Sequence, residues 1–261
     1  MHEKYVVIIP TFNRVVHTQK ILEELAKYAN HVSDILICDS GSTDGTRPIA
    51  KKFGAKFLEL NQGYYWTGAI SCGLQWCSQR SVKNILIIND DISLSADFEI
   101  NLLENINDLG DGSGVFIPHQ VDLRGNSFYG YSQTNRGLKV MSSYDPTADV
   151  FAGNGCFVYL HNIDASNIVI PENIYPHYFG DLVLFLILKK LGYFIRVIPT
   201  IKVTHTSSTE IFKNENPLNC FFKKRSPFYL KSVICYTWIL KAHTKRRSTA
   251  VGFLLNQFIM Y

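Results

Sequence analysis

Four short segments with strand character alternate with helical patterns over the first third of the chain, and this alternation constrains the fold more than any other feature. The four segments are Tyr5–Ile9, Ile35–Cys38, Lys56–Leu60 and Ile85–Ile88. Runs rich in β-branched apolar residues are typical of strands buried on both faces of a parallel sheet. A helix between successive strands favours right-handed crossovers. We therefore predict an α/β fold with a mostly parallel central sheet flanked by helices.

Polar side chains follow these strands at the points where they end. Thr11, Asp39, Asn61 and the pair Asp90 and Asp91 occupy such positions. The carboxyl ends of the strands in an open α/β sheet border a single crevice, where ligands bind. Mg²⁺ or Mn²⁺ commonly joins one or two carboxylates to substrate phosphates. The pattern favours a metal-assisted ligand site, although a strand end with solvated acids before a helix cap would use the same residues.

Several other classes of site are disfavoured by what the sequence lacks. The first turn has no Gly-x-Gly-x-x-Gly pattern, and no Gly-Lys-Ser or Gly-Lys-Thr occurs, which argues against dinucleotide and P-loop sites. None of the six cysteines forms a Cys-x-x-Cys pair, so neither zinc nor a redox motif is indicated. A net charge of +4 does not by itself indicate nucleic acid. A nucleotide bound through a metal-bridged diphosphate fits better.

We also expect a cytoplasmic protein. The chain is 46% hydrophobic and 18% charged, which is ordinary for a folded protein. The N-terminus enters a strand almost at once, with no pattern of a secretory signal. The sequence contains no run of eighteen apolar residues, so a membrane-spanning helix is not expected.

Three motifs together resemble a known family. They are Ile8–Arg14, Ile37–Thr46 and Ile88–Asp91, and they look like the opening of family 2 glycosyltransferases of the GT-A fold. The resemblance extends over residues 4 to 210. It implies an inverting transferase that uses a UDP- or dTDP-sugar and Mn²⁺ or Mg²⁺. Bacterial relatives, including rhamnosyltransferase-like ones, build surface polysaccharides such as O-antigen or capsule on glycan or polyprenyl-diphosphate-linked acceptors.

The resemblance also suggests which residues bind the donor and the metal. The donor-binding candidates are Pro10, Thr11, Asn13, Arg14, Asp39, Trp66, Gly68, Asn89 and Asp90. Asp39 matches the position that reads the base, and Asp91 and His205 match the metal ligands. Asn89 stands where the strict Asp-x-Asp motif has its first acid. An ordinary core role for Trp66 is an equal alternative.

A second cluster of chemically interesting residues surrounds Asp181, at the start of an apolar helix. Inverting transfer needs a carboxylate that takes the proton from the attacking hydroxyl. Family members carry an acid pair here, but Gly180 replaces the first acid, so Asp181 is the candidate base. An aspartate in a first helical turn also caps the helix. Asn154 is a candidate acceptor contact or an ordinary turn asparagine.

We expect a glycosyltransferase domain over residues 1–213, with a nucleotide-binding half over about 1–92 and an acceptor half over about 93–213. Residues 214–261 combine basic clusters with apolar aromatic stretches. Amphipathic basic helices of this kind lie on anionic membranes or cover a sheet. We favour peripheral association with the inner face of the cell membrane.

Two other functions fit the same residues. A sugar nucleotidyltransferase also uses an α/β sheet and metal-binding acids, and it would release pyrophosphate. A non-catalytic sugar-binding or membrane scaffold would account for the departures from the family pattern at Ser71, Asn89 and Gly180.

Overall fold

The computed structural model describes residues 4–107, 112–134, 137–206, 224 and 230–235. Its first half alternates strands and helices as predicted. The elements are β1 (Tyr5–Thr11), α1 (Val15–Tyr28), β2 (Val32–Asp39), α2 (Thr46–Lys52), β3 (Lys56–Glu59), α3 (Trp66–Ser78) and β4 (Ile85–Ile88). The strand order is β3-β2-β1-β4, and all three pairings are parallel. The α/β fold is therefore confirmed, and the four strand ends meet at one edge of the sheet.

The second half extends the same sheet with mixed pairings. Its elements are β5 (Ile92–Leu94), α4 (Phe98–Asn107), β6 (Gly114–Val121), β7 (Ser127–Phe128), β8 (Tyr131–Thr134), β9 (Gly137–Val140), β10 (Val150–Ala152), β11 (Phe157–His161), the 3₁₀ helix η1 (Ala165–Asn167), α5 (Gly180–Lys190) and β12 (Phe194–His205). The order continues β4-β11-β6-β12-β5. β11 runs antiparallel to both neighbours, whereas β12 is parallel to β6. The parallel arrangement is thus complete in the first half and mixed beyond β4.

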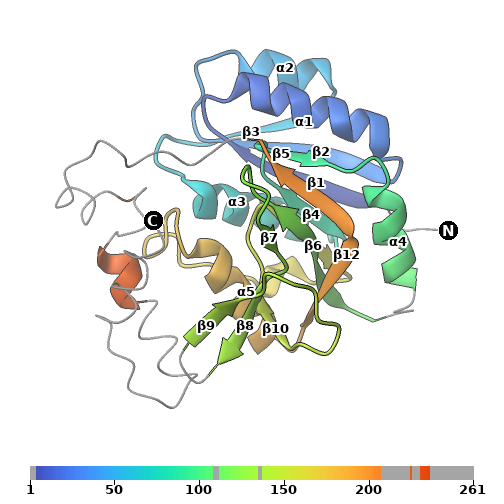
Figure 1. Ribbon diagram of the computed structural model, residues 1–261. Helices are drawn as coiled ribbons and strands as arrows, with labels where there is room; N and C mark the ends of the chain where they lie inside the picture. Colours follow the sequence, from blue (N-terminus) through green and yellow to red (C-terminus); the bar gives the residue numbers. More distant parts are fainter. Residues whose placement is uncertain (1–3, 108–111, 135–136, 207–223, 225–229, 236–261) are drawn as a thin grey trace.

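Helices cover both faces of this sheet (Figure 1). Alternate residues of β1 point to opposite faces, so Ile9 packs with α1 and α4 and Ile8 packs with α3. Both isoleucines are fully buried, and burial of such a side chain contributes about 1.5–3 kcal/mol. Continuous apolar strands are required because neither face is exposed to water. This two-sided core fixes the sheet edge that carries the polar strand ends.

A short helical segment at residues 230–235 packs against the loop that precedes α5. Ser232 Oγ donates a hydrogen bond of 2.6 Å to the carbonyl of Ile174, and Lys231 Nζ donates one of 3.0 Å to that of Asn173. The rest of the predicted C-terminal region, residues 214–261, lies outside the described residues apart from residue 224. Among the helices that the structure describes, none is long and apolar enough to cross a membrane.

Candidate functional site

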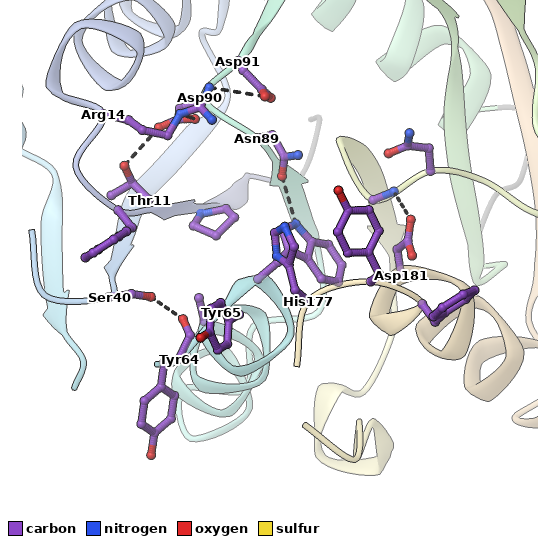
Figure 2. A pocket seen from close by; sticks show the side chains of 18 of the residues that line it. Thr11, Arg14, Ser40, Tyr64, Tyr65, Asn89, Asp90, Asp91, His177 and Asp181 are labelled. Carbon is purple, nitrogen blue, oxygen red and sulfur yellow. Dashed lines mark hydrogen bonds and ion pairs between the residues drawn. The ribbon is translucent and has the colours of Figure 1, made fainter. Parts of the chain in front are cut away.

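A cavity of about 730 Å³ opens where the carboxyl ends of β1 and β4 meet the start of α5 (Figure 2). Side chains from both halves of the chain line it. The predicted site residues on its wall are Pro10, Thr11, Arg14, Trp66, Asn89, Asp90, Asp91, Asn154, Asp181 and His205. Residues far apart in the sequence therefore meet in one place. Of the strand-end residues expected to share a crevice, Thr11, Asp90 and Asp91 line this cavity, whereas Asp39 and Asn61 do not.

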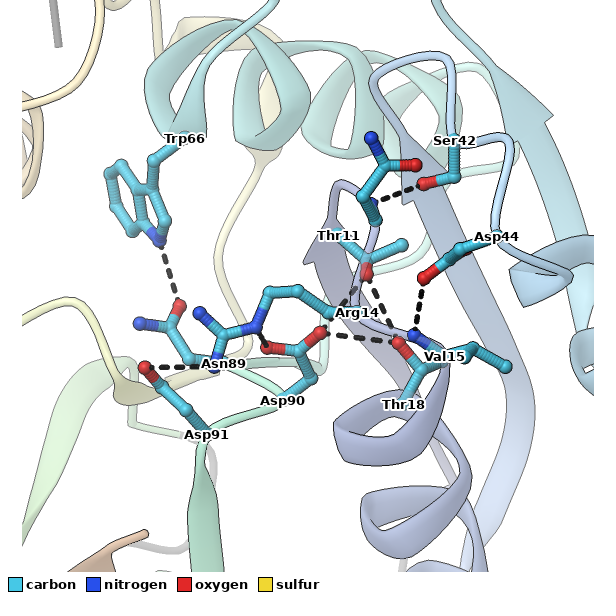
Figure 3. A network of polar contacts seen from close by, with 11 residues as sticks. Thr11, Arg14, Val15, Thr18, Ser42, Asp44, Trp66, Asn89, Asp90 and Asp91 are labelled. Carbon is cyan, nitrogen blue, oxygen red and sulfur yellow. Dashed lines mark hydrogen bonds and ion pairs between the residues drawn. The ribbon is translucent and has the colours of Figure 1, made fainter. Parts of the chain in front are cut away.

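The two acids that follow β4 have different surroundings (Figure 3). Asp90 is only 4% exposed, and Arg14 Nε lies 2.9 Å from its Oδ1. The hydroxyls of Thr11 and Thr18 donate to Asp90 Oδ2 at 3.0 and 3.1 Å. Burial raises the pKa of Asp90 to about 6, although Arg14 and the two hydroxyls favour the charged form. Asp90 therefore anchors Arg14 and the end of β1 from within the protein.

Asp91 is the more accessible acid of the pair. Its side chain is 19% exposed and lines the cavity, and Arg14 Nη2 lies 3.3 Å from its Oδ2. His205 lines the same cavity, with Nε2 placed 3.4 Å from Gln120 Oε1 and 3.8 Å from Cys156 Sγ. Asp91 and His205 thus offer an oxygen and an imidazole ligand on one wall.

These residues fit a divalent ion that is shared with a substrate. Within the described ranges, no group of three or more His, Cys, Asp or Glu side chains could hold a metal. Mg²⁺ is usually bound through one or two carboxylates together with substrate phosphates, and imidazole also suits several divalent ions. The donor set is therefore adequate only when phosphate oxygens complete it.

Asp39 lies behind the cavity wall and does not line it. It is 2% exposed, and its Oδ2 accepts hydrogen bonds from the amides of Ser42 (2.7 Å) and Gly41 (3.2 Å). Asn13 Oδ1 accepts a hydrogen bond of 2.8 Å from the Thr43 backbone amide, and the Asn13 backbone N–H donates one of 2.7 Å to Ser42 Oγ. Asn13 therefore ties the loop after β1 to the loop after β2, whereas Asp39 organises the loop that follows it. Neither residue lines the cavity.

Gly68 is also absent from the main cavity and lines a smaller neighbouring pocket of about 240 Å³. A Cβ there would lie 2.9 Å from the Tyr64 ring. The glycine therefore makes room for Tyr64, which lines both pockets.

Asp181 stands in the first turn of α5 and lines the same cavity as Asp91 (Figure 2). Its Oδ2 accepts a hydrogen bond of 3.2 Å from the Gly155 amide, and its Oδ1 accepts one of 2.9 Å from the Leu182 amide. Burial raises the pKa of Asp181 above its ordinary value, and these backbone hydrogen bonds oppose the rise. The Leu182 contact is a helix-terminal one, so the side chain stabilises the helix start and also faces the cavity.

Packing explains why Gly180 stands where family members carry the first acid of the pair. A Cβ at Gly180 would lie 1.8 Å from Thr67 Oγ1, and both residues are buried. No side chain fits between α3 and α5 at this point. Asp181 is consequently the single acid at the start of α5.

Asn154 lines the cavity, and its Oδ1 also accepts a hydrogen bond of 3.0 Å from the Cys156 amide. This is the geometry of an ordinary turn asparagine. Its amide nitrogen is the part of the side chain that remains available for an acceptor contact.

Sequence reasoning missed much of the aromatic lining. Tyr131, His177, Tyr178 and Phe179 all line the cavity. The last three are followed by Gly180 and then Asp181 in the sequence, and this proximity was a usable signal. Tyr131 gave no signal, because its position depends on the small sheet β10-β8-β9.

Comparison with known proteins gives one family match. The family model described as glycosyl transferase family 2 matches residues 6–165, which is more than half of the chain. A search of curated proteins finds no match.

Solved structures share the fold at low sequence identity. GalNAc-T7 with UDP, GalNAc and Mn²⁺ has a TM-score of 0.63 and 11% identity, covering 82% of this chain and 45% of that one. S. aureus TarS 1–349 in complex with UDP has a TM-score of 0.56 and 17% identity, covering 77% and 60%. Mycobacterium tuberculosis glucosyl-3-phosphoglycerate synthase with Mn²⁺, UDP and glucosyl-3-phosphoglycerate has a TM-score of 0.54 and 14% identity, covering 89% and 79%. The chain thus spans about half the length of the first two.

Proposed function

We infer that this chain, which belongs to glycosyl transferase family 2, transfers a sugar from a nucleoside-diphosphate-sugar to a hydroxyl group of an acceptor. One observation carries the proposal beyond the family. Asp91, just after β4, and Asp181, at the start of α5, line the same cavity. Sugar transfer needs stabilisation of a leaving diphosphate and a base for the acceptor, and the two carboxylates are suited to these separate tasks.

The reaction exchanges one bond at the anomeric carbon for another. The bond from that carbon to the diphosphate oxygen breaks, and its electron pair leaves with the nucleoside diphosphate. The acceptor oxygen forms the new bond from the opposite face, so the anomeric configuration is inverted. The acceptor proton passes to the Asp181 carboxylate.

Asp181 is suited to the role of base by its surroundings. A general base works best when its pKa is close to the working pH, and burial raises the pKa of this carboxyl. The amides of Gly155 and Leu182 hold the two oxygens in a fixed orientation. A fixed carboxylate needs little reorganisation when the proton moves.

Asp91 and His205 would hold Mn²⁺ or Mg²⁺, with phosphate oxygens of the donor completing the ligand set. The ion would act as a Lewis acid that offsets the charge on the leaving diphosphate. Arg14 reaches both acids and adds a permanent positive charge on the same side. The Mn²⁺ present in the GalNAc-T7 and glucosyl-3-phosphoglycerate synthase structures supports a divalent ion.

The donor is proposed to be a UDP- or dTDP-sugar, and UDP in all three compared structures supports a pyrimidine nucleotide. Pro10, Thr11 and Arg14 would lie along the nucleotide. The aromatic wall of Tyr131, Tyr178 and similar side chains suits a glycan or lipid-linked glycan acceptor, because aromatic rings bury large apolar areas and still offer a polar group. Synthesis of bacterial surface polysaccharide at the inner face of the membrane is the proposed setting.

The test is a panel of nucleotide-sugars incubated with Mn²⁺ or Mg²⁺, following release of nucleoside diphosphate. Release from one donor that is lost with chelator and in Asp91→Ala would support the proposal. Release of pyrophosphate from a sugar phosphate and a nucleoside triphosphate would instead identify a nucleotidyltransferase. Binding of nucleotides without release in the presence of any acceptor would point to a non-catalytic module.

A further inference from the structure

We propose that Trp66 is a positioning residue for Asp181, and that Asn89 acts in the reaction by holding Trp66 and not as a metal ligand. The inference rests on the proposed function and adds a specific link between the donor side and the acceptor side of the cavity. The link runs from the end of β4, through the first residue of α3, to the first turn of α5.

The first contact joins Asn89 to Trp66. Trp66 Nε1 donates a hydrogen bond of 2.9 Å to Asn89 Oδ1 (Figure 3). A buried indole N–H usually finds a partner, because leaving it without one is costly. The backbone of Asn89 is itself held, since its main-chain N–H donates a hydrogen bond of 2.9 Å to the Cys156 carbonyl. The indole N–H is therefore bound by a side chain whose main-chain position is fixed by the neighbouring segment.

The second contact places Gly155 between the six-membered ring of the indole and the base. A Cβ at Gly155 would lie 2.5 Å from Trp66 Cζ2 and 2.9 Å from Asp181 Cβ. The glycine is thus enclosed between the tryptophan ring and the base, with no space for a methyl group. The same glycine donates its amide to Asp181 Oδ2 at 3.2 Å. Any shift of the indole would move this amide, and the carboxylate that it orients would lose its position.

A third contact keeps α3 and α5 in register. Thr67, the next residue after Trp66, is fully buried and donates its amide to the Pro176 carbonyl at 3.2 Å. Its side chain fills the space beside Gly180. The first turn of α3 therefore contacts both the loop before α5 and the first residue of α5, just ahead of the base. Packed elements of this kind transmit displacements because protein interiors are nearly close-packed.

The amide at residue 89 has a chemical rationale in this arrangement. A carboxylate at this position would add a third negative charge directly before Asp90 and Asp91. Asn89 accepts the indole N–H without that charge. The departure from the strict acid motif thus exchanges a possible metal ligand for a contact that supports the base.

The experiment compares Trp66→Phe with Trp76→Phe in the full chain. Trp76 lies near the other end of α3, stacked against the Arg80 guanidinium at 4.0 Å, and it does not line either cavity. We expect Trp66→Phe to lower kcat for transfer about threefold to tenfold, the effect of losing one hydrogen bond. The dissociation constant for nucleoside diphosphate should stay within about twofold, and Trp76→Phe should change neither value.

Two double variants distinguish positioning from a general structural effect. In an Asp181→Asn background, Trp66→Phe should lower kcat no further, because its effect passes through the carboxylate. Asn89→Leu should match Trp66→Phe, and the two changes together should be no worse than either alone.

Three results would overturn the proposal. The first is that Trp66→Phe lowers kcat as much in the Asp181→Asn background as in the wild type. The second is that the effects of Asn89→Leu and Trp66→Phe on kcat add up in the double variant. The third is that Trp66→Phe weakens nucleotide binding by the same factor as it lowers kcat. A wild-type chain that transfers no sugar from any donor would instead refute the proposed function, and this inference with it.

Discussion

Replacing Gly180 with alanine tests how closely α3 and α5 pack beside the base. The added methyl group would lie 1.8 Å from Thr67 Oγ1 and 3.0 Å from Thr67 Cβ, and Thr67 is fully buried. Favourable contacts between carbon atoms need roughly 3.5–4.0 Å. One helix must therefore move by on the order of 1 Å, which displaces Asp181 as well.

The stability cost follows from two opposing terms. Overpacking of a dense core costs about 1–3 kcal/mol, and the severity of this clash places the cost near the upper end. Alanine gains roughly 0.5–1 kcal/mol over glycine in a helix. We expect Gly180→Ala to lower the free energy of unfolding by about 2 kcal/mol, and Tm by about 4–8 °C for a chain of this size.

Urea unfolding followed by circular dichroism measures this change, with Thr67→Ala as the matched partner. Thr67 Oγ1 is buried without a hydrogen-bond partner among the described residues, so its removal loses little polar stabilisation. The double variant Gly180→Ala/Thr67→Ala should regain about 1 kcal/mol or more over Gly180→Ala alone. Wild-type stability in Gly180→Ala, or no recovery in the double variant, would refute the steric argument.

Three further predictions concern single carboxylates. Asp181→Asn should lower kcat by about 10²–10⁴-fold with nucleotide binding intact. Because burial raises the pKa of Asp181, the wild-type rate should begin to fall, as pH decreases, at a higher pH than it would for an ordinary carboxyl. The residual rate of Asp181→Asn should not show this fall at acidic pH. Asp91→Ala should weaken Mn²⁺ binding at least tenfold in the presence of nucleoside diphosphate, measured by calorimetry, and unchanged affinity would exclude Asp91 as a ligand. Burial would raise the pKa of Glu99, but hydrogen bonds from Asn30, His31 and Tyr5 hold it below its ordinary value. The stabilisation by the Glu99 carboxylate is therefore present above its unfolded-state pKa and is lost as pH falls through its folded-state pKa. Glu99→Gln should lower the free energy of unfolding by about 1–3 kcal/mol at pH 7 and by less near pH 3. An equal loss at both pH values, measured by urea unfolding, would contradict this assignment.

The first half of the fold was predictable because its signals are local. β1 and β4 contain continuous apolar runs, and a polar residue follows each run: Thr11 is the last residue of β1, and Asn89 comes directly after β4. Parallel pairing then follows from the helices between them. The position of β11 between β4 and β6 was not predictable, because it depends on pairings between residues distant in the sequence.

The site was predicted in part for the same reason. Asp91 follows an apolar strand and Asp181 lies at the start of an apolar helix, and both elements are recognisable in the sequence. Their placement on one cavity could therefore be anticipated. Asp39 was expected to face the nucleotide, but its carboxylate accepts hydrogen bonds from the loop that follows it. Its role as a base contact stays a prediction. Such turn geometry depends on backbone angles that the residue types alone do not determine.

The packing around Trp66 could not be read from the sequence at all. The aromatic run before α3 fitted core and ligand roles equally well. The contact of Trp66 with Asn89 and its approach to Gly155 arise only when α3, β4 and the start of β11 are brought together. These contacts convert an ambiguous aromatic residue into a specific hypothesis about the base.

The anomeric configuration of the product tests the central claim most directly. The donor found in the nucleotide-sugar panel would be incubated with its acceptor, and the new linkage would be assigned from the one-bond carbon–hydrogen coupling at the anomeric carbon. We predict a linkage opposite in configuration to the donor, formed by the wild-type chain and nearly abolished in Asp181→Asn. A product that retains the donor configuration, or one formed equally well by Asp181→Asn, would contradict the account.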